Sequence, residues 1–493
     1  MYRQGLGDCF LLSFLGWPTP RHVLVDCGVI VGTADATARM QRVAADIERA
    51  SGGRLDLVVI SHEHWDHLSG FQQASEIFAR IAIGEVWAAW TENASDAEAA
   101  RLDRTRQRAL AALEANITAL AATEPDDLRP LVELLGFSGI ELGADGRTAQ
   151  GSSRTRAARD SILERGRRPG SLLRYLEPGD GPLGIADVDG VRAYVLGPPR
   201  GAMLRKTDGS VPRGEVYGLF GGAGGAFVDF ALGRAPAPSA FEADDAAAPL
   251  RLFDERHGID LAAIERASWS TLPALRAYVG PAADDPRWLP EPVDWRQIDE
   301  IGLDAAEALA LQLDNATNNT SLVLAFELPD GRVLLFPGDA QIGSWLSWAG
   351  LHWPRDAPAG SAGTVALGDL LARTILYKVG HHGSHNATLR KGGLEAMCSP
   401  ELVAMLPVDE RFAHESKGWV RMPLPALVDE LRARTQGRLI RADQLLRAPR
   451  ALTDGRVLPP LLADGAVPAE FARRLQSDDD ELYVDYRIPL RAE

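Results

Sequence analysis

The sequence predicts an α+β fold with two large, mainly helical or irregular inserts. Apolar runs such as residues 55–60 and 374–379 have the length of strands and end in polar residues. Other segments, such as residues 37–50, repeat apolar residues every three or four positions, as helices do. Two long stretches, 91–178 and 200–310, interrupt this pattern. The predicted core therefore consists of three pieces, which are residues 1–90, 179–199 and 311–493, the last including a C-terminal tail.

Each predicted element rests on a local signal. Pro329-Asp330-Gly331 is a turn sequence that joins two apolar runs into a hairpin, and residues 482–488 alternate as a closing strand. Strands are expected, in chain order, at residues 8–14, 22–27, 55–60, 84–89, 191–199, 321–327, 332–336, 374–379, 402–406 and 482–488. Helices are expected at residues 37–50, 70–80, 96–123, 127–136, 152–165 and 423–434.

Length and composition suit a large cytoplasmic protein. The 493 residues exceed one ordinary domain, and a hydrophobic content of 46% is sufficient for a buried core. Three cysteines do not make a disulfide framework, and no apolar run approaches the roughly 20 residues of a membrane span. We therefore expect a cytoplasmic location and no membrane association.

The charge balance limits the kinds of substrate. A formal net charge of −16 argues against a broad nucleic-acid surface, because such binding depends on Lys and Arg neutralising phosphates. The one basic concentration is a group of six arginines between Arg154 and Arg168. These arginines either meet phosphates or form a solvated helix face interleaved with Asp160 and Glu164. The acidic balance favours a small or locally gripped substrate.

Four side chains of metal-ligand type lie together after the predicted strand 55–60. They are His62, His64, Asp66 and His67. Three imidazoles and a carboxylate are costly to bury unless a cation accepts their lone pairs. This ligand set suits zinc, with manganese or iron as weaker alternatives. Because residues two apart in an extended segment point the same way, His62 and His64 are able to grip one ion. Asp66 and His67 lie where a helix should begin, which turns them toward a second ion.

Two other interpretations of this motif are weaker. A His-rich surface turn does not explain the ordered pattern His-x-His-x-Asp-His after a buried strand. A metalloprotease helix needs His-Glu-x-x-His, with both histidines on one helical face. The motif therefore favours a buried metal site.

The motif resembles that of the metallo-β-lactamase fold superfamily of metal-dependent hydrolases. Further segments are similar, in the same order, to the soluble hydrolase domain of ComEC-type competence proteins, which take up DNA. These segments are Gly5-Leu6-Gly7-Asp8, Val23-Leu24-Val25-Asp26-Cys27-Gly28, Asn318-Asn319-Thr320-Ser321, Leu334-Leu335-Phe336-Pro337-Gly338-Asp339 and Lys378-Val379-Gly380-His381-His382-Gly383-Ser384. The resemblance implies a four-layer αβ/βα sandwich. In competence proteins this domain accompanies a membrane channel, which this sequence does not predict.

The resemblance implies six metal ligands for two ions. The first ion would take His62, His64 and Asp339, and the second Asp66, His67, Asp339 and His382. Asp339 would be the bridge, because a carboxylate offers two oxygens to two cations. His382 is preferred to His381 as the ligand, and the reverse assignment stays open. His381 would then contact substrate or move a proton.

Several residues are expected beside the ligands. Many relatives supply a further His to the first metal, and the only candidate between His67 and Asp339 is His257, which we expect not to bind metal. Asp26 would hold a His tautomer or the motif turn, and Asp8 and Ser384 are further supports. No residue is assigned to substrate binding.

The implied chemistry is hydrolysis by a dinuclear site with a metal-bound hydroxide. Two divalent ions lower the pKa of a bridging water from about 16 towards about 7, and offset the charge that develops on a phosphoryl or carbonyl oxygen. Asp66 would orient the hydroxide and His381 would move a proton, so these are the expected catalytic residues. Zinc is the preferred metal and manganese the alternative.

The leading function is a phosphodiesterase or nuclease-like enzyme. Its substrate would be a phosphorylated small molecule or single-stranded nucleic acid. The first alternative is hydrolysis of carboxylic esters, lactones or thioesters at the same site. The second is a metal-stabilised module without turnover, whose inserts bind a protein partner. The second insert, 200–310, would act as a lid or as the partner surface.

Overall fold

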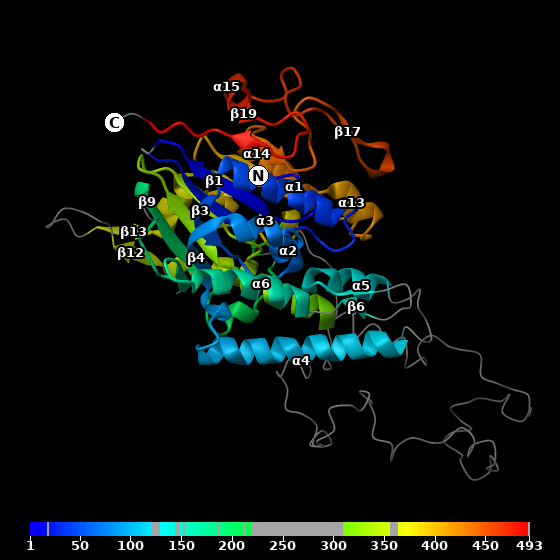
Figure 1. Cartoon of the computed structure of the whole chain (residues 1–493). Coiled ribbons are helices and arrows are strands. Elements are labelled where there is room, and N and C mark those ends of the chain that lie inside the picture. Colours follow the sequence, from blue (N-terminus) through cyan, green and yellow to red (C-terminus); the bar gives the residue numbers. More distant parts are fainter. Residues whose placement is uncertain are drawn as a thin grey trace, which may run out of the picture.

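Two β-sheets form the centre of the molecule (Figure 1). The computed structural model describes residues 1–491 except 17–18, 121–128, 143–147, 151–152, 186–187, 211–212, 218–308 and 355–362. One sheet has the strand order β1-β2-β3-β4-β7, and the other has the order β16-β15-β14-β11-β10-β9-β8. An apolar core that draws side chains from both sheets, including Phe10, Val59 and Phe336, lies between them.

The five-stranded sheet contains β1 (Cys9–Phe14), β2 (Arg21–Cys27), β3 (Arg54–Val59), β4 (Ala82–Ala89) and β7 (Leu172–Leu176). β1 and β2 are antiparallel, and β2, β3, β4 and β7 are parallel. β3 is buried on both faces, since Leu57 and Val59 pack toward the other sheet while Leu55 and Val58 pack against helices. That double burial explains the continuous apolar run in the sequence.

The seven-stranded sheet contains β8 (Leu183–Ile185), β9 (Val188–Gly197), β10 (Val323–Glu327), β11 (Val333–Phe336), β14 (Thr374–Lys378), β15 (Val403–Leu406) and β16 (Leu439–Arg441). The pairs β8-β9, β9-β10 and β10-β11 are antiparallel, and β11, β14, β15 and β16 are parallel. β10 and β11 form the hairpin predicted across residues 329–331. The parallel half matters most here, because β11 and β14 lead directly into Asp339 and the His381-His382 pair.

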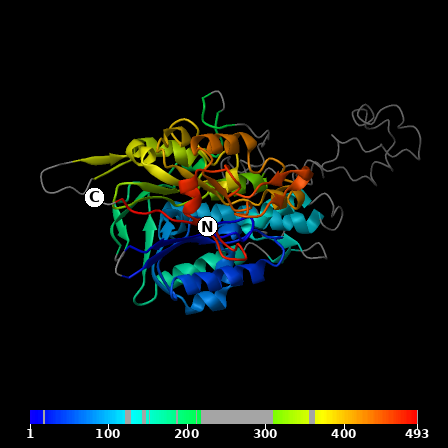
Figure 2. The ribbon, with the colours of Figure 1, turned by 90° about the horizontal axis from the view of Figure 1, so that it is seen from above.

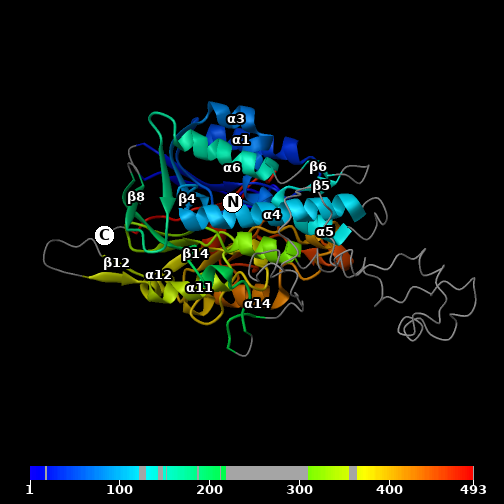
Figure 3. The same cartoon turned by 90° about the horizontal axis from the view of Figure 1, so that it is seen from below.

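Helices cover the outer face of each sheet (Figures 2 and 3). The five-stranded sheet is covered by α1 (Ala36–Ala50), α2 (Trp65–Gln73), α3 (Ser75–Arg80) and α6 (Ser153–Gly166). The seven-stranded sheet is covered by α11 (Ile342–Ser347), α12 (Leu367–Ala372) and α14 (Pro425–Arg434). In Figure 3 the two groups of helices lie on opposite sides of the sheets.

Shorter elements complete the described part. The long helix α4 (Ala97–Leu120) and α5 (Arg129–Leu135) belong to the first predicted insert. The remaining helices are α13 (Glu410–Glu415) and α15 (Ala469–Arg473), with 3-10 turns η1 (Trp90–Glu92), η2 (Gly136–Ser138), η3 (Met203–Arg205), η8 (Trp348–Gly350), η9 (His381–Gly383), η10 (Leu394–Ala396) and η11 (Thr453–Gly455). Two-stranded ribbons are β5 (Glu141–Leu142) with β6 (Thr148–Gln150), β12 (His352–Pro354) with β13 (Thr364–Ala366), β17 (Arg450–Ala451) with β18 (Val457–Leu458), and β19 (Leu475–Gln476) with β20 (Asp485–Tyr486).

Three features differ from the sequence-based expectations. The insert 91–178 is not only helical: β7 is an edge strand of the first sheet, and α6 covers that sheet. The helix expected at 70–80 begins earlier, at Trp65, and is divided into α2 and α3. The closing strand expected at 482–488 is reduced to β20, which pairs with β19 and joins neither large sheet, although Val484 lies in the apolar core between the sheets.

Among the described residues, no helix has both the length and the apolar character that a membrane crossing requires.

Candidate metal centre

The loop that carries the metal motif is held from behind by Asp26, at the end of β2. The Asp26 carboxylate accepts hydrogen bonds from the backbone N–H of Ser61 at 2.8 Å and from its hydroxyl at 2.7 Å. Two glycines of the resembling segments let the chain pass close to the start of α2, since a Cβ on Gly7 or Gly28 would lie within 2.7 Å of Asp66 backbone atoms. The small residues therefore place the motif directly against β2.

Four of the predicted ligands meet in one buried cluster: Asp66, His67, Asp339 and His382. One ligand atom from each lies within 4.8 Å of all the others. The Asp66 carboxylate is 2.9 Å from His382 Nε2, and the Asp339 carboxylate is 3.2 Å from His67 Nε2. Asp66 and His67 come from the first turn of α2, while Asp339 follows β11 and His382 follows β14. Both sheets thus contribute to the cluster.

His62 and His64, the other two predicted ligands, form a pair beside this cluster. His62 Nε2 lies 3.0 Å from His64 Nδ1, and the His62 ring centroid is 4.3 Å from that of His67. Both side chains are buried. The structure therefore brings all six predicted ligands into one region, while the bridging role of Asp339 stays a prediction.

Each of the four imidazoles has an outer partner that fixes which nitrogen faces inward. His67 Nδ1 lies 2.8 Å from Asp26, and His382 Nδ1 lies 2.6 Å from the Pro407 carbonyl. His62 Nδ1 lies 3.0 Å from the Ser61 hydroxyl. His64 is turned the other way, with Nε2 at 3.7 Å from the Asp314 carboxylate. Such partners set the tautomer and orientation of metal-binding histidines, so Nε2 of His62, His67 and His382 and Nδ1 of His64 face the cluster.

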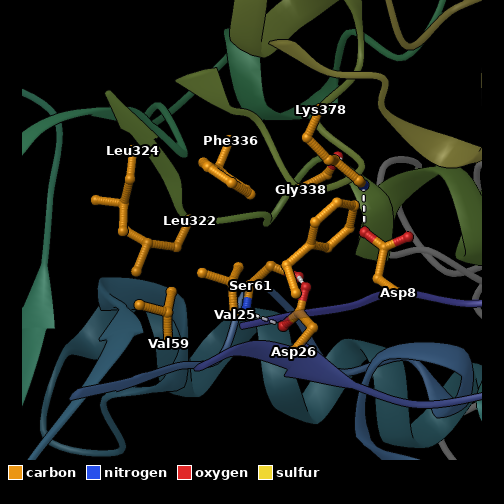
Figure 4. Close-up of a pocket in the computed structure, with 11 residues that line it drawn as sticks. Asp8, Val25, Asp26, Val59, Ser61, Leu322, Leu324, Phe336, Gly338 and Lys378 are labelled. Carbon is orange, nitrogen blue, oxygen red and sulfur yellow. Dashed lines mark hydrogen bonds and ion pairs between the residues drawn. The ribbon is translucent and has the colours of Figure 1, made fainter. Parts of the chain in front are cut away.

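Lys378, which the sequence analysis did not single out, is a buried cation behind the cluster (Figure 4). Its ammonium forms an ion pair with Asp8 and donates to Asp339 at 2.9 Å and to the Gly338 carbonyl at 2.8 Å. Burial alone would lower the pKa of Lys378, but Asp339 and Asp8 raise it above its ordinary value. A lysine at the end of an otherwise apolar strand was the signal in the sequence, because a buried Lys is almost always paired.

His381 lies at the edge of the cluster and differs from His382 in its environment. Its backbone N–H donates to Asp339 at 2.8 Å, and its Nδ1 lies 3.1 Å from the Ser384 hydroxyl. Burial lowers the pKa of His381 to about 4, so the imidazole is neutral at pH 7. Ser384 therefore lies where a support of His381 was expected, and it also donates to Asn386 at 2.8 Å.

Asp314 is a further buried carboxylate that sequence reasoning missed. It lies in the helical residues 309–318 and accepts a hydrogen bond from the Asn318 amide at 3.1 Å. Burial, together with the nearby Asp66 and Asp339, raises the pKa of Asp314 well above its ordinary value. No local pattern marks this residue, because its burial depends on how the helix packs over the cluster.

The donor set fits metal ions. Asp66 Oδ1 is a buried side-chain atom without a hydrogen-bond partner among the described residues. Unpartnered buried polar atoms are costly unless an ion satisfies them. Burial would lower the pKa of His67, yet Asp339, Asp66, Asp8 and Asp26 raise it well above its usual range. Negative charge therefore dominates the cluster, as a cation site requires.

Arginines of the group between Arg154 and Arg168 form contacts with acidic side chains and backbone carbonyls of the protein itself. Arg159 is buried, where it forms an ion pair with Glu63 and donates to Glu92 at 2.9 Å. Arg156 pairs with Asp103, and Arg165 donates to backbone carbonyls. Since Glu63 lies within the metal motif, this group helps to hold the motif loop. His257 lies outside the described residues.

Comparison with known proteins found a likeness for part of the chain. No curated protein and no solved structure matched the chain. A family model described as the Metallo-beta-lactamase superfamily matches residues 6–146, which include the metal motif. Most members of that superfamily are metal-dependent hydrolases, and the buried Asp and His groups are able to hold a metal ion. Residues 6–146 are thus similar to the metallo-β-lactamase superfamily, and this likeness suggests metal-dependent hydrolysis.

Proposed function

We propose that this protein is a dinuclear metal-dependent hydrolase that cleaves phosphodiesters. The proposal places two divalent ions among the six ligands His62, His64, Asp66, His67, Asp339 and His382. It also takes the two facing sheets and their outer helices as a four-layer αβ/βα sandwich. We further propose a cytoplasmic location.

The balance of buried charge supports two ions rather than one. Five buried carboxylates surround the imidazoles, and they are Asp8, Asp26, Asp66, Asp314 and Asp339. Lys378 offsets one of the five negative charges. In the metal-bound state, with the carboxylates ionised and the imidazoles neutral, two divalent cations would neutralise the remaining four charges, whereas one would leave two unbalanced. Because unbalanced buried charge is costly, this observation carries the dinuclear proposal.

The protein residues have separable roles in this scheme. When bound, the ions would lower the pKa of water and offset charge on the substrate oxygens. Asp66, whose pKa is lowered by His67 and His382 against the opposing effect of burial, is ionised and able to accept a proton at Oδ1. His381, neutral at pH 7, is positioned by Ser384 to move a proton at the edge of the cluster.

Two observations support a phosphodiester of limited size as substrate. The segment from Lys378 to Ser384 resembles the competence proteins, whose hydrolase domain is associated with nucleic acid. The arginines of α6 are mainly engaged with acidic side chains and backbone carbonyls, which leaves little basic surface for long duplexes. A phosphorylated small molecule or single-stranded nucleic acid therefore fits best, with zinc or manganese as the metal.

The test combines metal analysis with a substrate panel. We expect purified protein to bind two equivalents of zinc or manganese and to hydrolyse bis-p-nitrophenyl phosphate. Asp66→Asn and His381→Ala should lower kcat, and His381→Ala should retain both ions. Turnover of lactones or thioesters but not phosphodiesters would instead support the ester alternative. Two bound ions without turnover on any substrate would contradict an enzyme and support a partner-binding role for the inserts.

A further inference from the structure

We propose that Asn318 is a ligand of the first metal ion through its amide oxygen, Oδ1. This inference rests on the proposed dinuclear site and deepens it, because it supplies a ligand that the motif does not provide. Asn318 is fully buried and ends the helical residues 309–318. Its side chain lies between His62, Asp314 and His381.

The distances place Asn318 Oδ1 beside His62 Nε2, the nitrogen of His62 that faces the cluster. Asn318 Oδ1 lies 3.1 Å from His62 Nε2, and His62 Nε2 lies 3.0 Å from His64 Nδ1. Donor atoms that share one tetrahedral zinc ion at about 2.0–2.1 Å are separated by a little over 3 Å. Both distances are close to those of donor atoms that share one ion, and all three side chains are buried.

Metal binding at His62 would make these atoms present lone pairs to one another. His62 Nδ1 lies 3.0 Å from the Ser61 hydroxyl and 3.2 Å from the Ser321 hydroxyl, which hold the ring on its outer side. In the proposed site His62 Nε2 binds the ion and therefore carries no proton. An amide oxygen has no proton either. Two acceptors at 3.1 Å repel each other unless a cation lies between them.

The orientation of the Asn318 amide is fixed on its other side. Its Nδ2 donates to the Asp314 carboxylate at 3.1 Å and lies 3.4 Å from His381 Nε2. The Ser384 hydroxyl donates to Asn386, so it accepts from His381 Nδ1, and His381 Nε2 is an acceptor. A flipped amide would turn its oxygen toward this acceptor. His381 therefore keeps Asn318 Oδ1 pointed at His62.

The neighbouring Asn319 shows that this arrangement is not a general turn cap. The Asn319 amide nitrogen donates to the backbone carbonyls of Met203, Leu204 and Lys206. Its oxygen accepts from the backbone N–H groups of Gln341 and Ser344. Asn319 is thus fully used in tying loops together. Asn318 instead directs its oxygen at an imidazole.

The ligand set has a consequence for metal choice. An amide oxygen is a harder donor than an imidazole, and oxygen ligands suit manganese better than nitrogen ligands do. The first site should therefore bind zinc less tightly than a three-histidine site and should accept manganese. The second site, with two imidazoles and two carboxylates, should be less affected.

The test measures metal binding directly. Metal-free full-length protein is titrated with Zn²⁺ and Mn²⁺ by calorimetry, and Co²⁺ absorption reports the ligand geometry. We expect Asn318→Leu to weaken one of the two binding steps by at least about tenfold, the lower end of what even outer partners of metal ligands contribute. Asn318→Asp should restore that step. The control is Asn315→Leu, the same change on the same helix, where the side chain contacts Gln341 and Asn386.

The outcomes separate this inference from the proposed function. A folded Asn318→Leu variant with two unchanged binding steps and an unchanged Co²⁺ spectrum would overturn the role of Asn318. Loss of one step in Asn318→Leu but not in Asn315→Leu, with no phosphodiester turnover by the wild type, would uphold the ligand and reject the substrate. A wild-type protein that binds no metal would overturn both.

Discussion

Three residues of the metal centre have left-handed backbone conformations that non-glycine residues rarely adopt. The φ angles are 56° at Asp26, 44° at His381 and 51° at His382. Such conformations cost on the order of 1–3 kcal/mol each and persist where surrounding contacts determine them. Here the contacts are those of the cluster: Asp26 holds Ser61 and His67, and the His381 N–H holds Asp339. The strained residues are therefore those of the metal centre whose positions are fixed by these contacts.

Gly28→Ala tests how closely the chain must approach the motif. A Cβ at Gly28 would lie 2.4 Å from the carbonyl carbon of Asp66 and 2.6 Å from the His67 nitrogen. Because these are backbone atoms, α2 would have to move away from β2, carrying Asp66 and His67 with it. We expect a loss of about 1–3 kcal/mol in the free energy of unfolding and reduced metal content. Denaturant unfolding and metal analysis measure both.

Gly184→Ala is the matched control for that substitution, since a Cβ there meets no atom within 4 Å. It should leave stability and metal content nearly unchanged. Equal behaviour of the two variants would show that the packing of Gly28 against α2 is unimportant.

At the scale of elements, helices α4 and α6 reach back to the metal motif. Arg106 of α4 donates to Glu63 at 2.6 Å, and Arg159 of α6 pairs with both Glu63 and Glu92. Burial raises the pKa of Glu63 although both arginines oppose the shift. The first insert is therefore a structural support of the motif loop as well as a cover for the sheet.

Asp96→Ala tests the anchoring of α4. The Asp96 carboxylate accepts from the Ala99 N–H at 2.9 Å, a capping contact at the start of the helix. This hydrogen bond, followed by that of Arg200, lowers the pKa of Asp96 below its ordinary 3.8. A lowered carboxyl pKa stabilises the fold above pH 3.8, and that contribution is lost as the pH falls through the folded-state value. We expect Asp96→Ala to cost about 1 kcal/mol at pH 7.

Urea unfolding at several pH values measures this contribution. The difference between wild type and Asp96→Ala should narrow below pH 3.8, while Asp96→Asn should retain most of the stability at pH 7, since Asn also caps helices. A difference that stays constant from pH 7 to pH 2.5 would rule out the ionised cap.

At the scale of the whole molecule, the metal centre connects the two sheets. Asp66 and His67 follow β3 of one sheet, while Asp339 and His382 follow β11 and β14 of the other. The ion pair between Lys378, at the end of β14, and Asp8, just before β1, also joins the two sheets, without a metal ion (Figure 4). Metal binding and the packing of the two sheets are therefore linked equilibria.

Chelation tests this linkage. Removing the ions leaves the buried carboxylates facing one another, so the melting temperature should fall. A ligand present at about 100 times its Kd stabilises the folded state by about 2.7 kcal/mol. Differential scanning calorimetry with EDTA, and after zinc is restored, measures the shift. His382→Ala should show a smaller shift, and an equal melting temperature with and without EDTA would contradict the metal centre.

Much of this architecture was predictable from the sequence, for physical reasons that differ between elements. The hairpin of β10 and β11 and the double-buried β3 follow local patterns, and the metal motif is six residues long, so its chemistry is visible without the fold. Asp339 and His382 needed the family resemblance, because only tertiary structure brings them to the motif. The structure gathers them there, although their roles as ligands stay predictions.

Other features could not be predicted from local patterns. The burial of Lys378 and Asp314 depends on partners at least 39 residues away in the sequence. β7 was missed because Leu172–Leu176 is short and only half buried, so its apolar pattern is weak. The expected closing strand was wrong for a different reason: Val484, Tyr486 and Ile488 alternate and pack on the apolar core, but only β20 pairs with another strand.

The connection between the sheets also bears on the order of events during folding. Residues 66 and 382 are 316 positions apart, so their contact closes a very long loop. Contacts of this separation form late, after local hairpins and helices. A chain with only one sheet formed would offer half of the donor atoms, and would compete poorly for scarce ions. The final phase of refolding should therefore accelerate with added zinc, while the early phases should not respond.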